Sequence, residues 1–311
     1  MDHHIGFAFS IEQISFAVFE RPDMVLSGLG STAYPFDYAE ERFLQQEARI
    51  SLTSVLKNIL VDKEVNAKSV AFSIESNLAT LKRITYPENL EESGVTDHIT
   101  WHLAESLNQP VNSYTVVRSG NISEREGLKE ELVITIKRDL VRFFREIARD
   151  LEIPLKSLTV HHLAAEFALN SAFAEKPEKL LLLLKITPSR VESCFFLDGR
   201  YYNSHFSRLP AGNTAQEFES NLINQLKQEI GYIENLLMSG DQKLQLPVNR
   251  ILAYGPALDA SLLSTIQKNM SIPVERFNPL NNIAVADALK QSVTAETASH
   301  YVECVGVSLD Q

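Results

Sequence analysis

The chain has 311 residues, of which 44% are hydrophobic and 22% charged, and its net charge at pH 7 is -11. This composition is typical of globular proteins, and the length predicts about two domains. The acidic balance argues against nucleic acid as a partner, because phosphate binding needs a basic surface.

Cysteine use and hydropathy narrow the class of protein further. The two cysteines, Cys194 and Cys304, form no CxxC pair, so they predict neither a disulfide framework nor a zinc site and fit a reducing compartment. The start, MDHHIGFAFS, lacks the basic and long apolar segments of a signal peptide. The longest apolar run, 180–184, is far shorter than a membrane span. We therefore expect a cytoplasmic protein.

The first half of the chain reads as alternating strands and helices. Alternating apolar residues favour strands, and apolar residues that recur every three or four positions favour helices. The expected elements are a hairpin at 5–20, a strand with a glycine-rich turn at 24–36, a helix at 38–61, a strand at 69–75, an extended segment at 78–90 and a helix at 95–107. The extended segment, LATLKRITYPENL, is expected to end its pairing at Pro87, because proline has no backbone N–H.

Further strands and helices complete this half. The expected elements are strands at 112–120 and 130–138, a helix at 140–153 that Asp139 caps, a strand at 155–160 and a helix at 161–175. The polar segment EKPEK, 175–179, breaks helical structure and predicts a hinge.

The second half repeats the opening plan. The expected elements are three strands within 179–209, a helix at 214–238, a strand at 248–255, a helix at 257–270, an extended segment at 272–279 and a short helix or strand at 298–310. A hairpin, another strand and a helix thus occur twice, which suggests two α/β lobes that face each other across a cleft. The hairpin turns near Ser10 and Pro188 are expected to point into that cleft, where α/β sheets bind ligands.

Three stretches resemble the PilM family in the same order along the chain. The segment LATLKRITYPENLEESGVTDHITWHLAESLNQPVNSYTV has the arginine, proline and tryptophan landmarks at Arg83, Pro87 and Trp101. The segment ELVITIKRDLVRFFREIARDLEIPLKSLTVHHLAAEFAL resembles the strands and helices that follow. The closing motif, RILAYGPALDASLLSTIQKNMSIPVERFNPLNNI, ends near Asn278 and Pro279.

The resemblance implies an α/β protein with the actin-like ATPase (ribonuclease H-like) fold, in which two lobes carry an inserted FtsA-like subdomain. It implies a first lobe at 1–83 and 158–176, an inserted subdomain at 84–157, and a second lobe at 177–311 with a reduced insert around 214–242. PilM-like proteins lie in the cytoplasm, at the inner face of the inner membrane, within the type IV pilus platform. They bind nucleotide between the lobes and a short tail of the membrane protein PilN in a groove of the first lobe. The secretion protein GspL has a related cytoplasmic domain.

The resemblance also locates the nucleotide site, and there this sequence departs from the pattern. Ala8 and Ser10 stand in the first hairpin where aspartate and glycine are expected, and Lys185 and Thr187 replace the same pair in the second hairpin. Glycine lets backbone N–H groups approach phosphates, and aspartate holds Mg²⁺. A lysine at a metal-ligand position repels Mg²⁺ and can take the place of the cation.

Two more positions of the nucleotide site are altered. A Gly-Gly pair of the adenosine motif reads Gly255-Pro256, and an acidic position after strand 155–160 corresponds to Thr159 or His161. We therefore expect no catalytic residues, no ATP hydrolysis, no metal and no required cofactor. Binding of ATP without turnover stays open, since an ammonium group can meet a phosphate.

The resemblance assigns partner capture to the inserted subdomain, near Arg83, Tyr86 and Trp101. Segment 78–87 offers a strand edge to which a peptide can pair, and Trp101 on the next helix either walls a pocket or packs in a core. Arg83 meets either a partner's oxygen atoms or only solvent. His161 and His162 are adjacent, lack a third ligand at metal spacing, and are interpreted as ordinary polar contacts.

These observations support one main hypothesis and two alternatives. The main hypothesis is a non-catalytic scaffold that binds the cytoplasmic tail of a PilN-like or GspL-like membrane protein. The first alternative is an ATPase or small-molecule kinase of the same fold, which would need a metal-binding carboxylate and a general base in the cleft. The second alternative is an assembly protein that polymerises.

Overall fold

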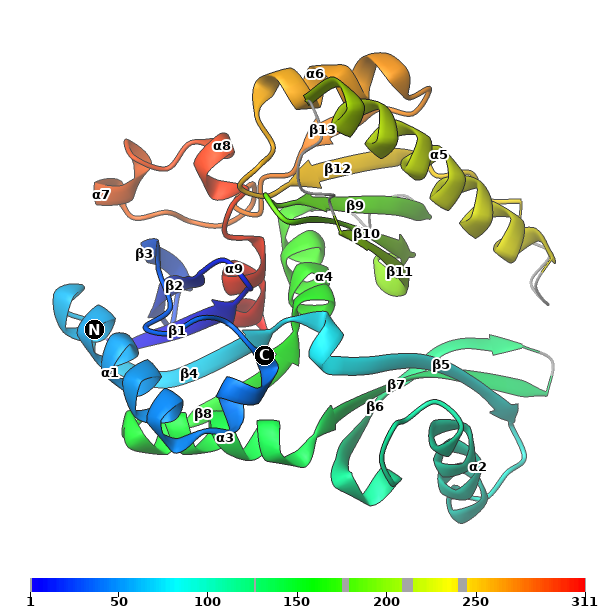
Figure 1. The fold of residues 1–311 in the computed structure, drawn as a ribbon, viewed down its shortest axis with the longest axis horizontal. Coiled ribbons are helices and arrows are strands. Elements are labelled where there is room, and N and C mark those ends of the chain that lie inside the picture. The colour runs from blue at the N-terminus through cyan, green and yellow to red at the C-terminus, as the bar shows by residue number, and fades with distance from the viewer. Residues whose placement is uncertain (1, 126, 175–178, 209–214, 240–244, 311) are drawn as a thin grey trace.

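The computed structural model describes residues 2–125, 127–174, 179–208, 215–239 and 245–310. These residues form two lobes, each built on a five-stranded sheet, and a smaller unit built on a three-stranded sheet (Figure 1). None of the described helices combines the length and apolar character needed to cross a membrane. The expected hinge at 175–179 lies almost entirely outside the described residues.

The first lobe has the strand order β3-β2-β1-β4-β8. Its strands are β1 (Asp2–Phe9), β2 (Ile14–Arg21), β3 (Val25–Thr32), β4 (Ala67–Ile74) and β8 (Leu155–Val160). The first three strands pair antiparallel, and β1, β4 and β8 run parallel. Its helices are η1 (Glu40–Leu44), α1 (Gln46–Asp62), α3 (Arg138–Asp150), α4 (His161–Ala172) and α9 (Val302–Leu309). Phe9, Phe72 and Phe144 pack together in the core between the sheet and α3.

The second lobe repeats this topology with the order β11-β10-β9-β12-β13. Its strands are β9 (Leu180–Ile186), β10 (Arg190–Leu197), β11 (Arg200–Arg208), β12 (Arg250–Tyr254) and β13 (Val274–Arg276). Its helices are α5 (Ala215–Ser239) and α6 (Ala260–Asn269), and two short helices follow, α7 (Asp287–Lys290) and α8 (Ala295–Ala298). Strand directions match those of the first lobe one for one. The expectation that one plan is used twice is confirmed.

The third unit is a three-stranded antiparallel sheet with one helix on it. Its elements are η2 (Ser76–Leu78), β5 (Ala79–Pro87), α2 (Glu92–Ala104), η3 (Val111–Ser113), β6 (Tyr114–Arg125) and β7 (Leu128–Lys137). The order β5-β7-β6 makes β5 and β6 the edge strands. Helix α2 packs on the sheet through Val95, Ile99 and Leu103.

The lobe boundaries in the structure differ from the expected ones. The three-stranded sheet occupies 79–137, whereas the expected subdomain was 84–157. Helix α3 lies on the first lobe because Phe143 and Phe144 pack against Phe43. Helix α9 contacts β1, β2, β4 and α4, so it too packs on the first lobe although 177–311 was assigned to the second. A helix's apolar stripe does not show which sheet it will cover.

Two local expectations were wrong. The glycine-rich stretch expected as a turn is strand β3, where Gly28 and Gly30 pair with Val18 and Phe16. A Cβ at Gly30 would lie 2.7 Å from the Phe16 ring, so the glycine makes room for that side chain. In addition, α3 begins at Arg138, so Asp139 lies in the first turn instead of capping the helix.

Helix α9 is held close to α4 by a glycine. A Cβ at Gly306 would lie 1.8 Å from the Ala164 carbonyl oxygen. We predict that Gly306→Ala lowers the free energy of unfolding by about 1–3 kcal/mol, because overpacking displaces the helix. Gly231→Ala on α5 is the matched control, since no atom of the described residues lies within 4 Å of a Cβ there. Alanine should stabilise that helix by about 0.5–1 kcal/mol.

Urea unfolding of both variants measures the two effects. Equal stability of Gly306→Ala and wild type would contradict the close packing of α9 on α4.

Candidate functional site in the cleft between the lobes

The two hairpin turns meet at the cleft, as the sequence predicted. Ser189 Oγ in the β9–β10 turn donates a hydrogen bond to Glu12 Oε1 in the β1–β2 turn, at 2.7 Å. Each turn is also closed internally. Ser10 Oγ donates to the Gln13 carbonyl oxygen at 2.9 Å, and the Thr187 N–H donates to the Arg190 carbonyl oxygen at 2.9 Å. Ser10 and Thr187 therefore stabilise the turns in which they lie.

Lys185 is buried in the cleft and pairs with a carboxylate on α9. Its Nζ lies 2.7 Å from Glu303 Oε1, which also accepts a hydrogen bond from the Tyr254 hydroxyl at 3.0 Å. Burial opposes the charge on Lys185, but Glu303 and two further carboxylates raise the pKa of the ammonium above its ordinary value. Burial, assisted by Lys185, lowers the pKa of His161 to about 3, so that imidazole is neutral. The second lobe thus inserts a cation into a carboxylate site of the first.

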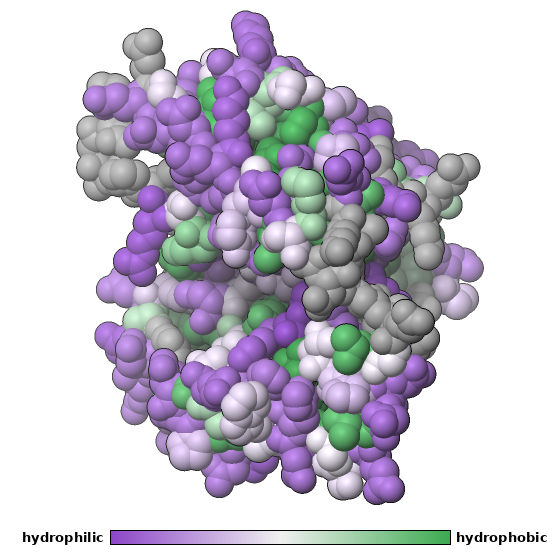
Figure 2. Space-filling model, turned by 90° about the vertical axis from the view of Figure 1, so that its right-hand side faces the viewer, coloured by the Kyte–Doolittle hydropathy of each residue, from purple (hydrophilic) through white to green (hydrophobic). Residues whose placement is uncertain are grey.

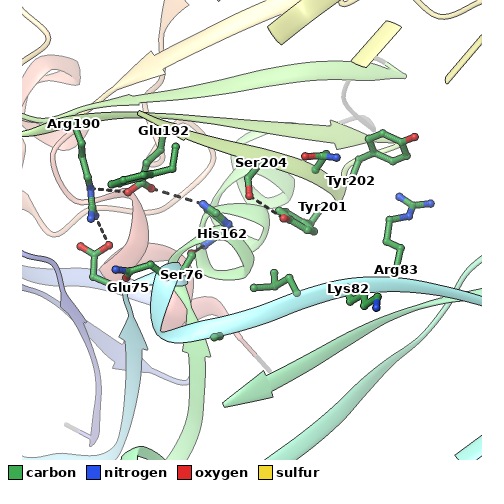
Figure 3. A pocket seen from close by; sticks show the side chains of 15 residues that line it. Glu75, Ser76, Lys82, Arg83, His162, Arg190, Glu192, Tyr201, Tyr202 and Ser204 are labelled. Carbon is green, nitrogen blue, oxygen red and sulfur yellow. Dashed lines mark hydrogen bonds and ion pairs between the residues drawn. The ribbon is translucent and has the colours of Figure 1, made fainter. Parts of the chain in front are cut away.

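Arg190 makes a second buried connection between the lobes (Figure 3). Its Nη2 pairs with Glu75 Oε2 of the first lobe, and its Nε lies 2.7 Å from Glu192 Oε1 on its own strand. Glu75 Oε1 also accepts a hydrogen bond from the Ile11 N–H at 2.9 Å. Glu192 is buried, which would raise its pKa, but Lys185 and then His162 hold the pKa of this carboxyl far below its ordinary value. We call Lys185, Arg190, Glu75, Glu192 and Glu303 the interlobe lock.

The other predicted nucleotide-site positions lie around the lock without joining it. Ala8 is buried and packs near Cys304 and Val305 of α9. Gly255 has φ +113°, and a Cβ there would lie 2.3 Å from the Ile186 carbonyl oxygen, so this glycine permits close approach to β9. Pro256 is exposed. Thr159 lies on β8, where it pairs with Ser73 of β4.

Four members of the lock were missed at the sequence level. Glu75, Arg190, Glu192 and Glu303 are single charges at the ends of, or within, otherwise apolar segments such as VAFSIE and YVECVGV. Such isolated charges are seldom buried unless paired, so they were a usable signal. His162, expected to make only polar contacts, stacks on Tyr201 and has Nε2 3.7 Å from Glu192 Oε2. In the described ranges no three His, Cys, Asp or Glu side chains are grouped to hold a metal ion.

The three predicted partner residues do not form one site. Arg83 points toward the second lobe, with its guanidinium 4.4 Å from the Tyr202 ring and its Nε 3.0 Å from Glu130 Oε1. Tyr86 lies on the other face of β5, buried against α2, and its hydroxyl donates to Glu131 Oε1 at 2.6 Å. Trp101 is 58% exposed on α2, so the interpretation of core packing was wrong.

Two hollows flank the three-stranded sheet instead. One, of 840 Å³, lies between β6 and α3 and is lined by Tyr114, Val116, Arg138, Val141, Arg142 and Arg145. We call it the arginine groove. The other, of 410 Å³, lies between β5 and β11 beside the lock. We call it the β5–β11 cavity, and Figure 2 shows this side of the molecule, hollowed between its upper and lower parts.

Comparison with known proteins identifies the fold. No protein-family model matches the sequence, and neither does any curated protein. A chain in a structure of the PilM–PilN type IV pilus biogenesis complex is 15% identical, has a TM-score of 0.79, and the match covers 98% of this chain and 97% of that one. The cytoplasmic domain of EpsL, an inner-membrane component of the Vibrio cholerae type II secretion system, has a TM-score of 0.46 at 12% identity, covering 89% and 98%.

A Bacteroides thetaiotaomicron protein with an actin-like ATPase fold has a TM-score of 0.47 at 15% identity, and the match covers 90% of this chain and 92% of that one. The duplicated sheets and their strand orders define an actin-like fold with a third, inserted unit. Within that class, the resemblance to PilM predicted from the sequence is confirmed at the level of the fold.

The lock predicts a pH-dependent cost of removing its lysine. Lys185→Met leaves Glu303 buried without its cation, which we expect to destabilise the protein by about 3–5 kcal/mol at pH 7.5. Loss of Lys185 removes the attraction that keeps the pKa of Glu303 low, so this carboxyl should protonate as the pH falls. The loss should therefore be smaller at pH 5, as measured by urea unfolding at both values.

The variant Lys185→Met with Glu303→Gln is the control, because it removes both charges together. It should recover most of the lost stability at pH 7.5. A single variant as stable as wild type at both pH values would contradict the pairing.

Proposed function

We propose that this chain is a non-catalytic scaffold in a type IV pilus or type II secretion-like assembly. It binds the short cytoplasmic tail of a PilN-like or GspL-like membrane partner and stands at the inner face of the inner membrane through that partner. The full-length likeness to a chain of the PilM–PilN complex supports the class of assembly. The interlobe lock is the observation that carries the non-catalytic role.

The lock bears on catalysis because it uses the charges that phosphate chemistry would need. Metal-assisted phosphoryl transfer needs a carboxylate that is free to hold Mg²⁺. Glu75, Glu192 and Glu303 each face a protein cation, and Lys185 stands where the PilM-like pattern has an aspartate. Entry of Mg²⁺ and ATP would have to displace buried ion pairs. This cost favours a scaffold over the alternative of an ATPase or kinase.

The arginine groove is the surface that we assign to the partner's tail. It has the edge strand β6 on one side and α3 of the first lobe on the other. An extended tail can pair with a strand edge through backbone hydrogen bonds while side-chain pockets supply specificity. Val116 of β6 is an exposed apolar residue of the groove, and Arg142 and Arg145 of α3 are exposed arginines that line it. The groove thus offers backbone, apolar and cationic contacts together.

The first prediction from this function is an absence of ATP chemistry. Purified protein should show no Mg²⁺-dependent ATP turnover above a blank, and millimolar ATP with Mg²⁺ should leave its melting temperature unchanged. A ligand at 100 times its Kd would add about 2.7 kcal/mol, which means a shift of a few degrees in a chain of this size. Mg²⁺-dependent ATP turnover by the wild-type protein that is lost in the Lys185→Met variant would contradict the proposed non-catalytic role.

The second prediction concerns the cytoplasmic tail of the proposed membrane partner. Arg142→Ala with Arg145→Ala should weaken binding of that tail, because charge-assisted hydrogen bonds to its oxygen atoms are lost. At about 1.5–3 kcal/mol for one such bond, Kd should rise by at least about tenfold. Fluorescence anisotropy with the labelled tail measures Kd, and circular dichroism confirms the fold.

Arg149→Ala is the matched control, since Arg149 is an exposed arginine of α3 that does not line the groove. Unchanged affinity in the double variant would place the partner's tail elsewhere on the molecule.

A further inference from the structure

The β5–β11 cavity lies between the open edges of two sheets. Within the part of the chain that the structure describes, β5 pairs with β7 alone and β11 with β10 alone. The cavity is walled by Ala79, Leu81 and Arg83 from β5 and by Tyr201, Tyr202 and Phe206 from β11 (Figure 3). Its volume of 410 Å³ is within the range of ligand sites. It is separate from the arginine groove, which lies against β6, the opposite edge of the three-stranded sheet.

The two edges are not equivalent. Strand β5 runs in unbroken register with β7 from Ala79 to Pro87, so up to that proline its free side is a regular row of backbone donors and acceptors. Strand β11 has an irregularity in register opposite Phe195 and Phe196, which leaves Tyr202 as an extra residue in the ladder. A bulge disrupts pairing and redirects a side chain. Strand β5 can therefore accept another strand, whereas β11 contributes side chains to the cavity.

An unsatisfied donor belongs to Arg83, which lines the cavity. Arg83 uses Nε and Nη2 on Glu130, at 3.0 Å and 2.5 Å, and its Nη1 is buried with no hydrogen-bond partner among the described residues. A buried donor without an acceptor is destabilising, and an incoming oxygen atom removes that penalty. The position of Arg83 Nη1 favours a ligand carboxylate or carbonyl.

The carboxylates that line this cavity disfavour anionic ligands such as phosphate. Glu75 and Glu192 line one end and are held by Arg190, so a phosphate group there would be repelled by two carboxylates and would compete for their cation. An extended polypeptide avoids that conflict, because its backbone is neutral and suits the β5 edge. Its apolar side chains suit the aromatic rings of Tyr201, Tyr202 and Phe206.

We propose that the β5–β11 cavity is a second peptide-binding site, which takes an extended partner segment as an added strand on β5. The wall residues 79–83 correspond to about five residues of strand at about 3.3 Å each. One acidic residue of the segment pairs with Arg83, and apolar residues two positions apart from one another pack against the rings of β11. This site does not depend on the function assigned to the arginine groove.

The test uses a phage-displayed library of random 12-residue peptides selected on wild-type protein. Enriched peptides should share an aspartate or glutamate and alternating apolar residues. For one such peptide, labelled for anisotropy, Tyr202→Ala should raise Kd about thirtyfold, the loss typical of an aromatic anchor. Tyr232→Ala removes an exposed tyrosine of α5 that packs on His205 of β11 but does not line the cavity, so it should leave Kd unchanged. Selection on Arg83→Gln should lose the preference for the acidic residue.

Hydrogen exchange then locates the bound peptide. Slower exchange in 79–83 and 201–206 is the expected result. Protection of β6 and α3, with affinity lost in the Arg142→Ala and Arg145→Ala double variant, would place the peptide in the arginine groove and overturn the proposal. Failure of wild type to enrich any sequence, or equal affinity in the Tyr202→Ala and Tyr232→Ala variants, would also overturn it.

Discussion

Buried opposite charges across the cleft are the interaction on which the arrangement of this molecule depends. Lys185 and Arg190 of the second lobe enter the first lobe's side of the cleft and meet Glu303 and Glu75. Buried ion pairs add little net stability compared with apolar packing. Separating the two charges is nevertheless unfavourable, because each is left unpaired in the protein interior. The lock thus specifies one relative position of the lobes more than it stabilises the fold. The β5–β11 cavity, which has one wall on the second lobe, takes its shape within that arrangement.

The sequence predicted the fold well, because the duplicated pattern of strands repeats regardless of what the loops carry. The resemblance to PilM also indicated Lys185, which stands where an aspartate is expected. It did not reveal Glu303 as the partner, since the two residues are joined only by the packing of α9 on the first lobe. The same packing explains the displaced boundary at 177–311. Tertiary contacts between segments far apart along a chain leave no local signature.

The alternation of side chains along one strand was enough to show that the predicted partner residues do not share a face. Arg83 and Tyr86 are three positions apart on one strand, and alternation places such residues on opposite faces. The structure accordingly directs Arg83 to Tyr202 and Tyr86 into the core beneath α2. By contrast, strand β3 could not be predicted from its composition alone. Its glycines resemble a turn, and only the bulk of Phe16 and Val18 on the neighbouring strand explains why they lie in a sheet.

The position of Glu303 along the chain has a consequence for synthesis. A ribosome completes the sheets of both lobes before it adds α9, and domains generally begin to fold as they emerge. Arg190 and Glu75 are therefore available to bring the lobes together early, while Lys185 still lacks its main counter-charge. Only when α9 docks against α4 and β1 does Glu303 reach that ammonium group. Until that step the first lobe lacks the helix that packs on α4 and β1, and the interlobe lock lacks its Lys185–Glu303 pair.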